Sequence, residues 1–277
     1  MTRLNLLLLP LLLTAALPAS AFDLGNAFKG VTDNKDQKSG LSLGKTSKED
    51  EIKIGREIAG NLLGAAPLVK DEALQKYINE VGRWVASQSE RPNLPWHFGV
   101  IESEDINAFA APGGYVLLTK GLYRKLQNEA ELAGVLGHEI GHVIKKHQLK
   151  LLQKSQLLNL GAGVLGESVG KGNDSIQKLI GSGAEICARS LDKDAEFEAD
   201  RIGVVLGTRA GYDPYGLPEV LIEIGHSSKD DGRVALLFKT HPHPDDRLVK
   251  LGEAIADRLD GVSDGKTLAD RFYKMKN

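Results

Sequence analysis

Cysteine is nearly absent from this sequence, because its 277 residues include only Cys187. A single thiol excludes an intramolecular disulfide and any zinc site built from several thiolates, so a metal site would have to use histidine and carboxylate side chains. An excess of charge of one sign is also missing, since 35 lysines and arginines stand against 37 acids for a net charge of -2. Without a basic excess or stripe, we expect no nucleic-acid partner.

Long apolar runs are confined to the N-terminus. Arg3 precedes a mostly apolar stretch over residues 4–17 that Pro10 interrupts, and small residues follow. This order is typical of a secretory signal peptide over residues 1–21, with cleavage after Ala21. The alternative, a membrane anchor, is less favoured because the run is shorter than the roughly 20 residues that span a bilayer. We therefore expect an exported mature chain without a membrane span.

The rest of the chain predicts one α+β, mainly helical domain. Residues 22–48 are rich in glycine and polar residues and predict an extended lead-in, and residues 49–277 are predicted to form the domain. Residues 157–186 are rich in glycine and predict packed helices or a mobile loop. The spacing of apolar residues gives the other elements. Helices are predicted over residues 49–63, 71–88, 129–152, 194–210, 217–225 and 246–259, and strands over residues 96–103 and 115–119.

The strongest predicted helix, over residues 129–152, carries an HEXXH motif, His138-Glu139-Ile140-Gly141-His142. Positions i and i+4 share one face of a helix, so the imidazoles of His138 and His142 can bind one metal ion. Glu139, one residue further round, would lie beside a metal-bound water. The motif therefore predicts a catalytic zinc site.

The competing interpretation of this motif is a surface helix with two solvated histidines. Apolar residues surround the motif, however, and Gly134, Gly137 and Gly141 lie inside the predicted helix. Each glycine costs about 1 kcal/mol relative to alanine at such a position, which indicates that another element must approach closely there. These features favour the zinc site.

Two histidines leave a catalytic zinc ion one protein ligand short. No histidine stands six residues beyond His142, and His147 lies off the ligand face of a continuous helix. The predicted helix over residues 194–210 offers the missing carboxylate, because Glu196 and Asp200 share a face. Glu196 can reach zinc while Asp200 accepts the outer N–H of a ligand histidine. Glu198 points elsewhere and is expected to be a solvated acid.

Four stretches of the sequence resemble metallopeptidase family 48, the family of HtpX, BepA and the CaaX prenyl proteases. They are Asn107 to Gly114, Gly137 to His142, Glu196 to Gly203, and Thr240-His241-Pro242 followed by Arg247. The resemblance extends from about Asp50 to Leu259. It implies a gluzincin-like zincin metalloprotease domain in which a small β-sheet packs on the HEXXH helix.

The resemblance also implies roles for individual residues. Glu196 falls on the third zinc ligand of the family, and Asp200 falls on the residue that supports a ligand histidine. His241 and Arg247 fall on residues that line the active site and contact the substrate or the transition state. Their plainer interpretations are a histidine in a histidine-containing loop, beside His243, and an arginine that begins a helix.

These assignments define a mechanism. One zinc ion per chain, held by His138, His142 and Glu196, keeps an open position for water and lowers the pKa of that water. Glu139 takes the proton as general base and passes it to the leaving amine. We also consider a control device, in which His241 serves as a fourth zinc ligand that displaces the water until substrate arrives.

The resemblance favours a zinc-dependent endopeptidase of the bacterial periplasm that cleaves misfolded or stalled envelope proteins. The outer-membrane assembly machinery is a candidate partner. Prenyl-protein processing is not favoured, because the sequence lacks a second apolar segment of spanning length, and the helical-repeat tail of BepA is absent too. The alternative function is a zinc-binding chaperone or assembly factor for outer-membrane proteins with a latent, occluded active site.

A few residues remain outside these assignments. Residues 115–119 are either an edge strand along which an extended substrate pairs or a core strand. Cys187 is expected to be buried rather than nucleophilic. Trp84 and Trp96 are expected to anchor the core. Three further histidines are expected to be structural or solvated: His97, His147 and His226.

Overall fold

A mixed three-stranded sheet is covered by helices in the structure, a computed structural model that describes residues 46–152, 191–228, 231–256, 259, 262 and 264–275. The described residues belong to one unit of the chain, Thr46–Asn277. The predicted signal peptide, almost all of the predicted lead-in, residues 157–186 and Cys187 lie outside the described residues.

The sheet has the strand order β1-β3-β2. Strand β3 (Tyr115–Thr119) pairs in parallel with β1 (His97–Ile101) and antiparallel with β2 (Ala108–Ala111). Of the two interpretations of residues 115–119, the core strand is therefore correct and the edge strand is wrong. Strand β2 was not predicted, because a run of three alanines and a phenylalanine lacks the β-branched residues that mark strands.

The turn between β2 and β3 depends on glycine. Gly113 and Gly114 have φ values of 78° and 106°, which residues with a Cβ rarely adopt. A Cβ on Gly113 would also come within 2.5 Å of the Cα of Ile52 on helix α2 (Lys48–Ala65). The turn thus lets the strands lie directly against this helix.

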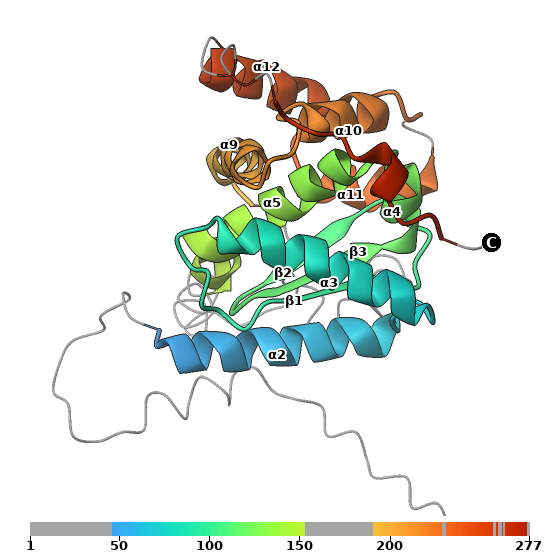
Figure 1. The fold of residues 1–277 in the computed structure, drawn as a ribbon. Coiled ribbons are helices and arrows are strands. Elements are labelled where there is room, and N and C mark those ends of the chain that lie inside the picture. Colours follow the sequence, from blue (N-terminus) through green and yellow to red (C-terminus); the bar gives the residue numbers. More distant parts are fainter. Residues whose placement is uncertain are drawn as a thin grey trace, which may run out of the picture. The chain divides into compact units, whose positions relative to one another are not determined.

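Helix α5 (Glu129–Lys145) lies between the sheet and a second group of helices (Figure 1). It contacts β2 and β3 on one side and α9 (Lys193–Arg209) and α10 (Gly216–Gly225) on the other. Helix α3 (Glu72–Ser87) packs along β1 and also contacts α5. All but the last two residues of α5 are buried, so the HEXXH motif lies in the interior of the domain.

The glycines of α5 face the backbones of other elements. This was predicted, because glycine destabilises a helix and its presence indicated a close neighbour. A Cβ on Gly134 would lie 2.6 Å from the backbone nitrogen of Leu217. A Cβ on Gly137 would lie 2.8 Å from the carbonyl oxygen of Gly203, and one on Gly203 would lie 2.8 Å from the backbone nitrogen of His138. Helices α5 and α9 therefore meet backbone to backbone beside the motif.

The start of α5 is fixed by polar contacts. At its start, the side chain of Asn128 accepts a hydrogen bond from the backbone N–H of Glu131. Glu129 is fully buried and accepts hydrogen bonds from Tyr77 and Tyr212, at 2.9 and 2.8 Å, and from the Arg271 guanidinium. These contacts tie the start of α5 to α3, to the segment after α9 and to the C-terminal part of the chain.

The end of α5 differs from the prediction, because the helix stops at Lys145 instead of continuing to residue 152. Lys146 adopts the left-handed conformation, with φ 59° and ψ 37°, and residues 147–152 form a separate helical segment. A left-handed lysine carries no signature in the sequence, since glycine is the usual residue at such a position.

Three α-helices remain among the described residues. The helices α4 (Lys120–Lys125) and α11 (Ala235–Thr240) were not predicted, whereas α12 (Pro244–Ile255) corresponds to the helix predicted over residues 246–259. Helix α12 starts two residues earlier than predicted, because Pro244 suits the first helical position. In the part of the chain that the structure describes, none of the helices is long and apolar enough to cross a membrane.

The two tryptophans have different environments. Trp96 is 5% exposed and belongs to the core, as predicted, whereas Trp84 is 53% exposed. The prediction for Trp84 is wrong because its indole lies on the outer side of α3, where Nε1 donates a hydrogen bond to the carbonyl of Ala210.

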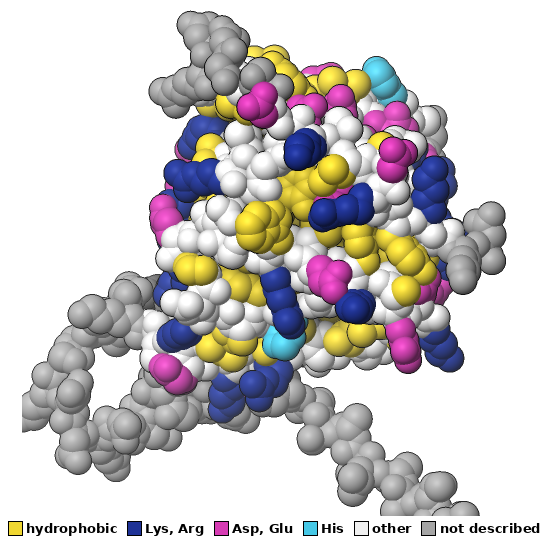
Figure 2. Space-filling model, viewed as in Figure 1, with side chains coloured by type: hydrophobic (Ala, Val, Ile, Leu, Met, Phe, Trp, Pro, Cys, Tyr) yellow, Lys and Arg dark blue, Asp and Glu magenta, His cyan; other side chains and the backbone are white. Residues whose placement is uncertain are grey.

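On the face that Figure 2 shows, basic and acidic side chains are interspersed.

The backbone contact between α5 and α9 can be tested with two alanine substitutions on one helix. Gly203→Ala should lower the free energy of unfolding by about 1 to 3 kcal/mol, because its Cβ would overlap the backbone of His138. Gly207→Ala has nothing within 4 Å of its Cβ and should raise it by up to about 1 kcal/mol through helix propensity. Chemical denaturation measures both, and equal effects of the two substitutions would contradict the packing.

Candidate metal centre

Four side chains from three parts of the fold meet at one point. His138 and His142 come from α5, Glu196 comes from the first turn of α9, and His241 follows α11. One ligand atom from each of the four lies within 4.8 Å of the others. The structure thus brings together the two histidines and the carboxylate that the sequence assigned to zinc, and it places His241, which the resemblance assigned to the active site, beside them.

The distances within this cluster are short. The Nε2 atoms of His138 and His142 are 3.0 Å apart. The carboxylate of Glu196 lies 3.7 Å from Nε2 of His138 and 3.5 Å from Nε2 of His142. Nε2 of His241 lies 3.7 Å from Oε2 of Glu196. The three imidazole rings and the carboxylate therefore direct their ligand atoms into the same small space.

Asp200 orients the imidazole of His138 through Nδ1, the ring nitrogen that is not directed at the cluster. Its Oδ1 lies 2.8 Å from Nδ1 of His138, so a neutral imidazole donates its Nδ1 proton to this carboxylate and leaves Nε2 as a lone-pair donor. Arg247 donates two hydrogen bonds to Asp200, at 2.9 and 2.5 Å. This arrangement matches the supporting role expected for Asp200. It places the Arg247 guanidinium on Asp200 and beside His138.

The charge of Arg247 also determines the state of Asp200. Burial alone would raise the pKa of Asp200, but the charge of Arg247 and hydrogen bonds from Arg247 and His138 outweigh burial and hold that pKa below its usual range. Asp200 is therefore ionised. Because Asp200 and Arg247 are both almost fully buried, they form a compensated ion pair next to the cluster.

The cluster itself suits a cation. Among the described residues, Oε2 of Glu196 is buried without a hydrogen-bond partner. Burial raises the pKa of Glu196 to about 8 against the opposing charge of Arg247, and burial lowers the pKa values of His138 and His142. Two imidazole nitrogens and a carboxylate oxygen are ligands that zinc prefers. These residues therefore fit a zinc ion.

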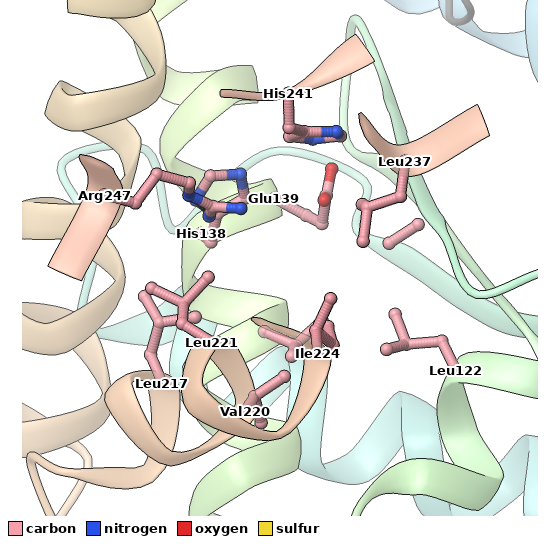
Figure 3. A pocket seen from close by; sticks show the side chains of 12 residues that line it. Leu122, His138, Glu139, Leu217, Val220, Leu221, Ile224, Leu237, His241 and Arg247 are labelled. Atoms are coloured by element: carbon pink, nitrogen blue, oxygen red, sulfur yellow. Dashed lines mark hydrogen bonds between the residues drawn. The ribbon is translucent and has the colours of Figure 1, made fainter. Parts of the chain in front are cut away.

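Glu139 lies beside the cluster without joining it. Its side chain is 4% exposed, and burial raises its pKa to about 8. Figure 3 shows its carboxylate directed toward the space beneath His241. A carboxyl group with a pKa near neutrality is suited to taking up and releasing a proton.

An apolar cavity opens next to Glu139 (Figure 3). His138, Glu139, His241 and Arg247 form its polar wall. The opposite wall is aliphatic and comes from α4, α5, α10 and α11: Leu122, Val135, Leu217, Val220, Leu221, Ile224 and Leu237. The polar side chains of the site thus form one wall of the apolar cavity.

Sequence reasoning missed two residues near the centre. His147 is 5% exposed, and its Nδ1 lies 2.9 Å from Nδ1 of His142. Glu198 was expected to be a solvated acid; its side chain is 38% exposed, and its Oε2 also lies 3.2 Å from Nε2 of His147. This contact forms because the bend at Lys146 turns His147 back toward α5 and α9. A helical wheel of a continuous helix cannot show this.

These features define a class of protein: a mainly helical domain with a small sheet, in which the histidines of an HEXXH helix face a carboxylate from a second helix. Residues 72–255 match Peptidase family M48, and the chain belongs to this family. The resemblance found in the sequence is thereby confirmed.

Three curated relatives, all longer than this chain, match most of it. A beta-barrel assembly-enhancing protease of Yersinia pestis is 35% identical over 217 residues, which cover 76% of this chain and 45% of that protein. The protein of that name from Escherichia coli K12 is 33% identical over 239 residues, 83% of this chain and 49% of that protein. The mitochondrial metalloendopeptidase OMA1 of Arabidopsis thaliana is 27% identical over 234 residues, 83% and 43% respectively. The chain spans about half the length of these relatives.

The raised pKa of Glu139 predicts a pH-dependent stability of the metal-free protein. In the folded state Glu139 keeps its proton up to about pH 8, whereas in the unfolded chain it loses the proton near the ordinary glutamate pKa of 4.5. Ionisation therefore favours unfolding as the pH rises between these values. The advantage of Glu139→Gln over the wild type should grow by about 3 to 4 kcal/mol from about pH 5 to pH 8.5.

Urea denaturation of chelator-treated protein measures this growth. Glu80→Gln, at an exposed position of α3, is the matched control and should show none. A constant difference between Glu139→Gln and the wild type across the pH range would contradict the raised pKa.

Proposed function

We propose that this protein is a zinc-dependent endopeptidase of the bacterial periplasm that cleaves misfolded or stalled envelope proteins. The observation that carries the proposal is the buried cluster of His138, His142 and Glu196 beside Glu139, in which one carboxylate oxygen of Glu196 has no hydrogen-bond partner among the described residues. The two relatives named as beta-barrel assembly-enhancing proteases support a role in the envelope, with the outer-membrane assembly machinery as a candidate partner.

The proposed fold type is a gluzincin-like zincin, in which His138, His142 and Glu196 hold one zinc ion per chain. Zinc in this place would act as a Lewis acid and bring the pKa of a bound water towards about 7. The chain's own residues supply the rest of the chemistry. Asp200 keeps Nε2 of His138 free of a proton, since its Oδ1 accepts the hydrogen bond from Nδ1–H at 2.8 Å and so favours that tautomer.

Glu139 is the proposed general base. It is close enough to the cluster to line the same space as His142 and Glu196, and burial keeps its pKa near neutrality. Such a group can accept a proton from the attacking water and donate it to the leaving amine within one turnover. The buried surroundings also exclude bulk water from this transfer.

His241 has two proposed roles that exclude each other at any one moment. As a neutral N–H donor it can stabilise negative charge on the scissile carbonyl oxygen. As a lone-pair donor it can bind the cation as a fourth ligand and block the position of the water. Its Nε2 lies 3.7 Å from Oε2 of Glu196, and its Nδ1 lies 2.9 Å from Oγ1 of Thr240. Both distances are compatible with a switch between the two roles.

This second role of His241 supports the alternative function, a zinc-binding chaperone or assembly factor with an occluded site. Such a protein would keep the cation and the fold but would not hydrolyse peptide bonds until His241 moves. Arg247 contributes to either function by holding Asp200, and its position on the cavity wall also allows contact with a bound chain.

The apolar cavity supports a preference among substrates. Its aliphatic wall faces Glu139, so a side chain next to the scissile bond is proposed to enter it. Aliphatic side chains are exposed in misfolded proteins and buried in folded ones. A protease that requires such a side chain next to the scissile bond would therefore act mainly on unfolded segments.

Proteolysis of an unfolded envelope protein by the zinc-loaded chain tests the proposal. The wild type should cleave, and Glu139→Gln with the same zinc content should lose at least about 100-fold in rate, because removal of a general base costs about two to four orders of magnitude. Sequencing of the products should place leucine, isoleucine or valine beside most cleaved bonds.

Three results would count against the proposal in different ways. Equal cleavage by both proteins would show that Glu139 is not the base. Silence from both would favour the occluded chaperone, and His241→Ala would then be the variant that restores cleavage. Cleavage sites with no aliphatic preference would contradict the role of the cavity.

A further inference from the structure

The bend after α5 gives His147 a position that a continuous helix would not allow. His147 lies five positions after His142, which corresponds to about 140° around a helix axis. The left-handed Lys146 interrupts the helix and redirects the chain, so that the rings of His142 and His147 meet at a centroid distance of 5.1 Å and an angle of 72°. Their Nδ1 atoms are 2.9 Å apart.

An ion-pair network holds this bend in place. Nζ of Lys146 lies 3.0 Å from Oε2 of Glu51, which is fully buried on α2. Arg91 binds both oxygens of Glu51, at 2.7 and 2.9 Å, and also donates to the carbonyl of Val143. The left-handed conformation is uncommon for a residue with a Cβ. Because several contacts hold Lys146 in it, the bend indicates that the position of the next residue, His147, matters for the site.

The hydrogen bonds around His147 define the tautomers of two histidines. The carboxylate of Glu198 can only accept, so the Nε2 of His147 that lies 3.2 Å from it carries the proton. The Nδ1 of a neutral His147 is then an acceptor. His142 must therefore donate from its own Nδ1, and its Nε2 is left with a lone pair directed at the cluster.

We propose that His147, oriented by Glu198, is a positioning residue that fixes His142 in its metal-binding tautomer. Asp200 does the same for His138 directly, at 2.8 Å. On the His142 side the carboxylate acts through an inserted imidazole, since Glu198 lies 38% exposed at the rim while His142 is buried. The inference rests on the proposed metal site, and metal affinity tests it separately from proteolysis.

Zinc affinity of three variants, measured by competition with a chelator, tests the proposal. His147→Leu removes the acceptor and should weaken binding by about 10- to 100-fold, the usual effect of losing a residue that orients a ligand. His147→Gln should stay within a few-fold of the wild type, because its amide can accept from His142 and donate to Glu198. His226→Leu, at an exposed histidine at the end of α10, is the control and should leave the affinity unchanged.

Two further measurements keep the test decisive if His147→Leu does not fold. Glu198→Ala, at the rim, should weaken zinc binding several-fold. Nitrogen-15 NMR of the zinc-loaded wild type should show the Nδ1–H tautomer of His142 and the Nε2–H tautomer of His147.

Specific results would overturn the inference. Unchanged affinity in His147→Leu, a His147→Gln variant as weak as His147→Leu, or a proton on Nδ1 of His147 would each do so while the proposed function stands. A wild-type chain without zinc affinity would overturn both.

Discussion

The site depends on how closely α5 and α9 approach each other. Gly137 and Gly203 let the two backbones touch, and a single Cβ at either position would overlap the other helix. This contact brings Glu196 and Asp200 to the histidines of the motif, since both carboxylates lie on the face of α9 that meets α5. A chain that placed side chains between the helices would separate the carboxylate from the imidazoles by the width of those side chains.

In the interior formed by this contact, a buried charged side chain is stable only when a side chain of opposite charge lies beside it. Asp200 is compensated by Arg247 from α12, and Glu51 by Arg91 and Lys146. The first pair lies beside His138, and the second lies at the end of α5. Glu196 differs, because its Oε2 is buried without a hydrogen-bond partner among the described residues and burial raises its pKa to about 8. A cation bound at this oxygen would stabilise the ionised carboxylate.

Much of the site follows from helical periodicity in the sequence. His138 and His142, and likewise Glu196 and Asp200, are four residues apart, so their shared faces can be predicted without knowing the fold. The glycines of α5 also predicted a close neighbour. Three features were not predictable in this way. Strand β2 consists mostly of alanine, Trp84 lies on the outer side of an otherwise amphipathic helix, and the left-handed Lys146 changes the direction of the chain before His147. Each depends on tertiary contacts that local patterns do not contain.

We propose that the contact between α5 and α9 assembles one zinc site from His138, His142 and Glu196. X-ray absorption at the zinc edge on the full chain, with zinc content measured on the same sample, tests this assembly. We expect one zinc ion per chain with imidazole nitrogens at about 2.0 to 2.1 Å and a carboxylate oxygen, and loss of that oxygen from the spectrum of Glu196→Ala. An identical spectrum and zinc content in Glu196→Ala would contradict it.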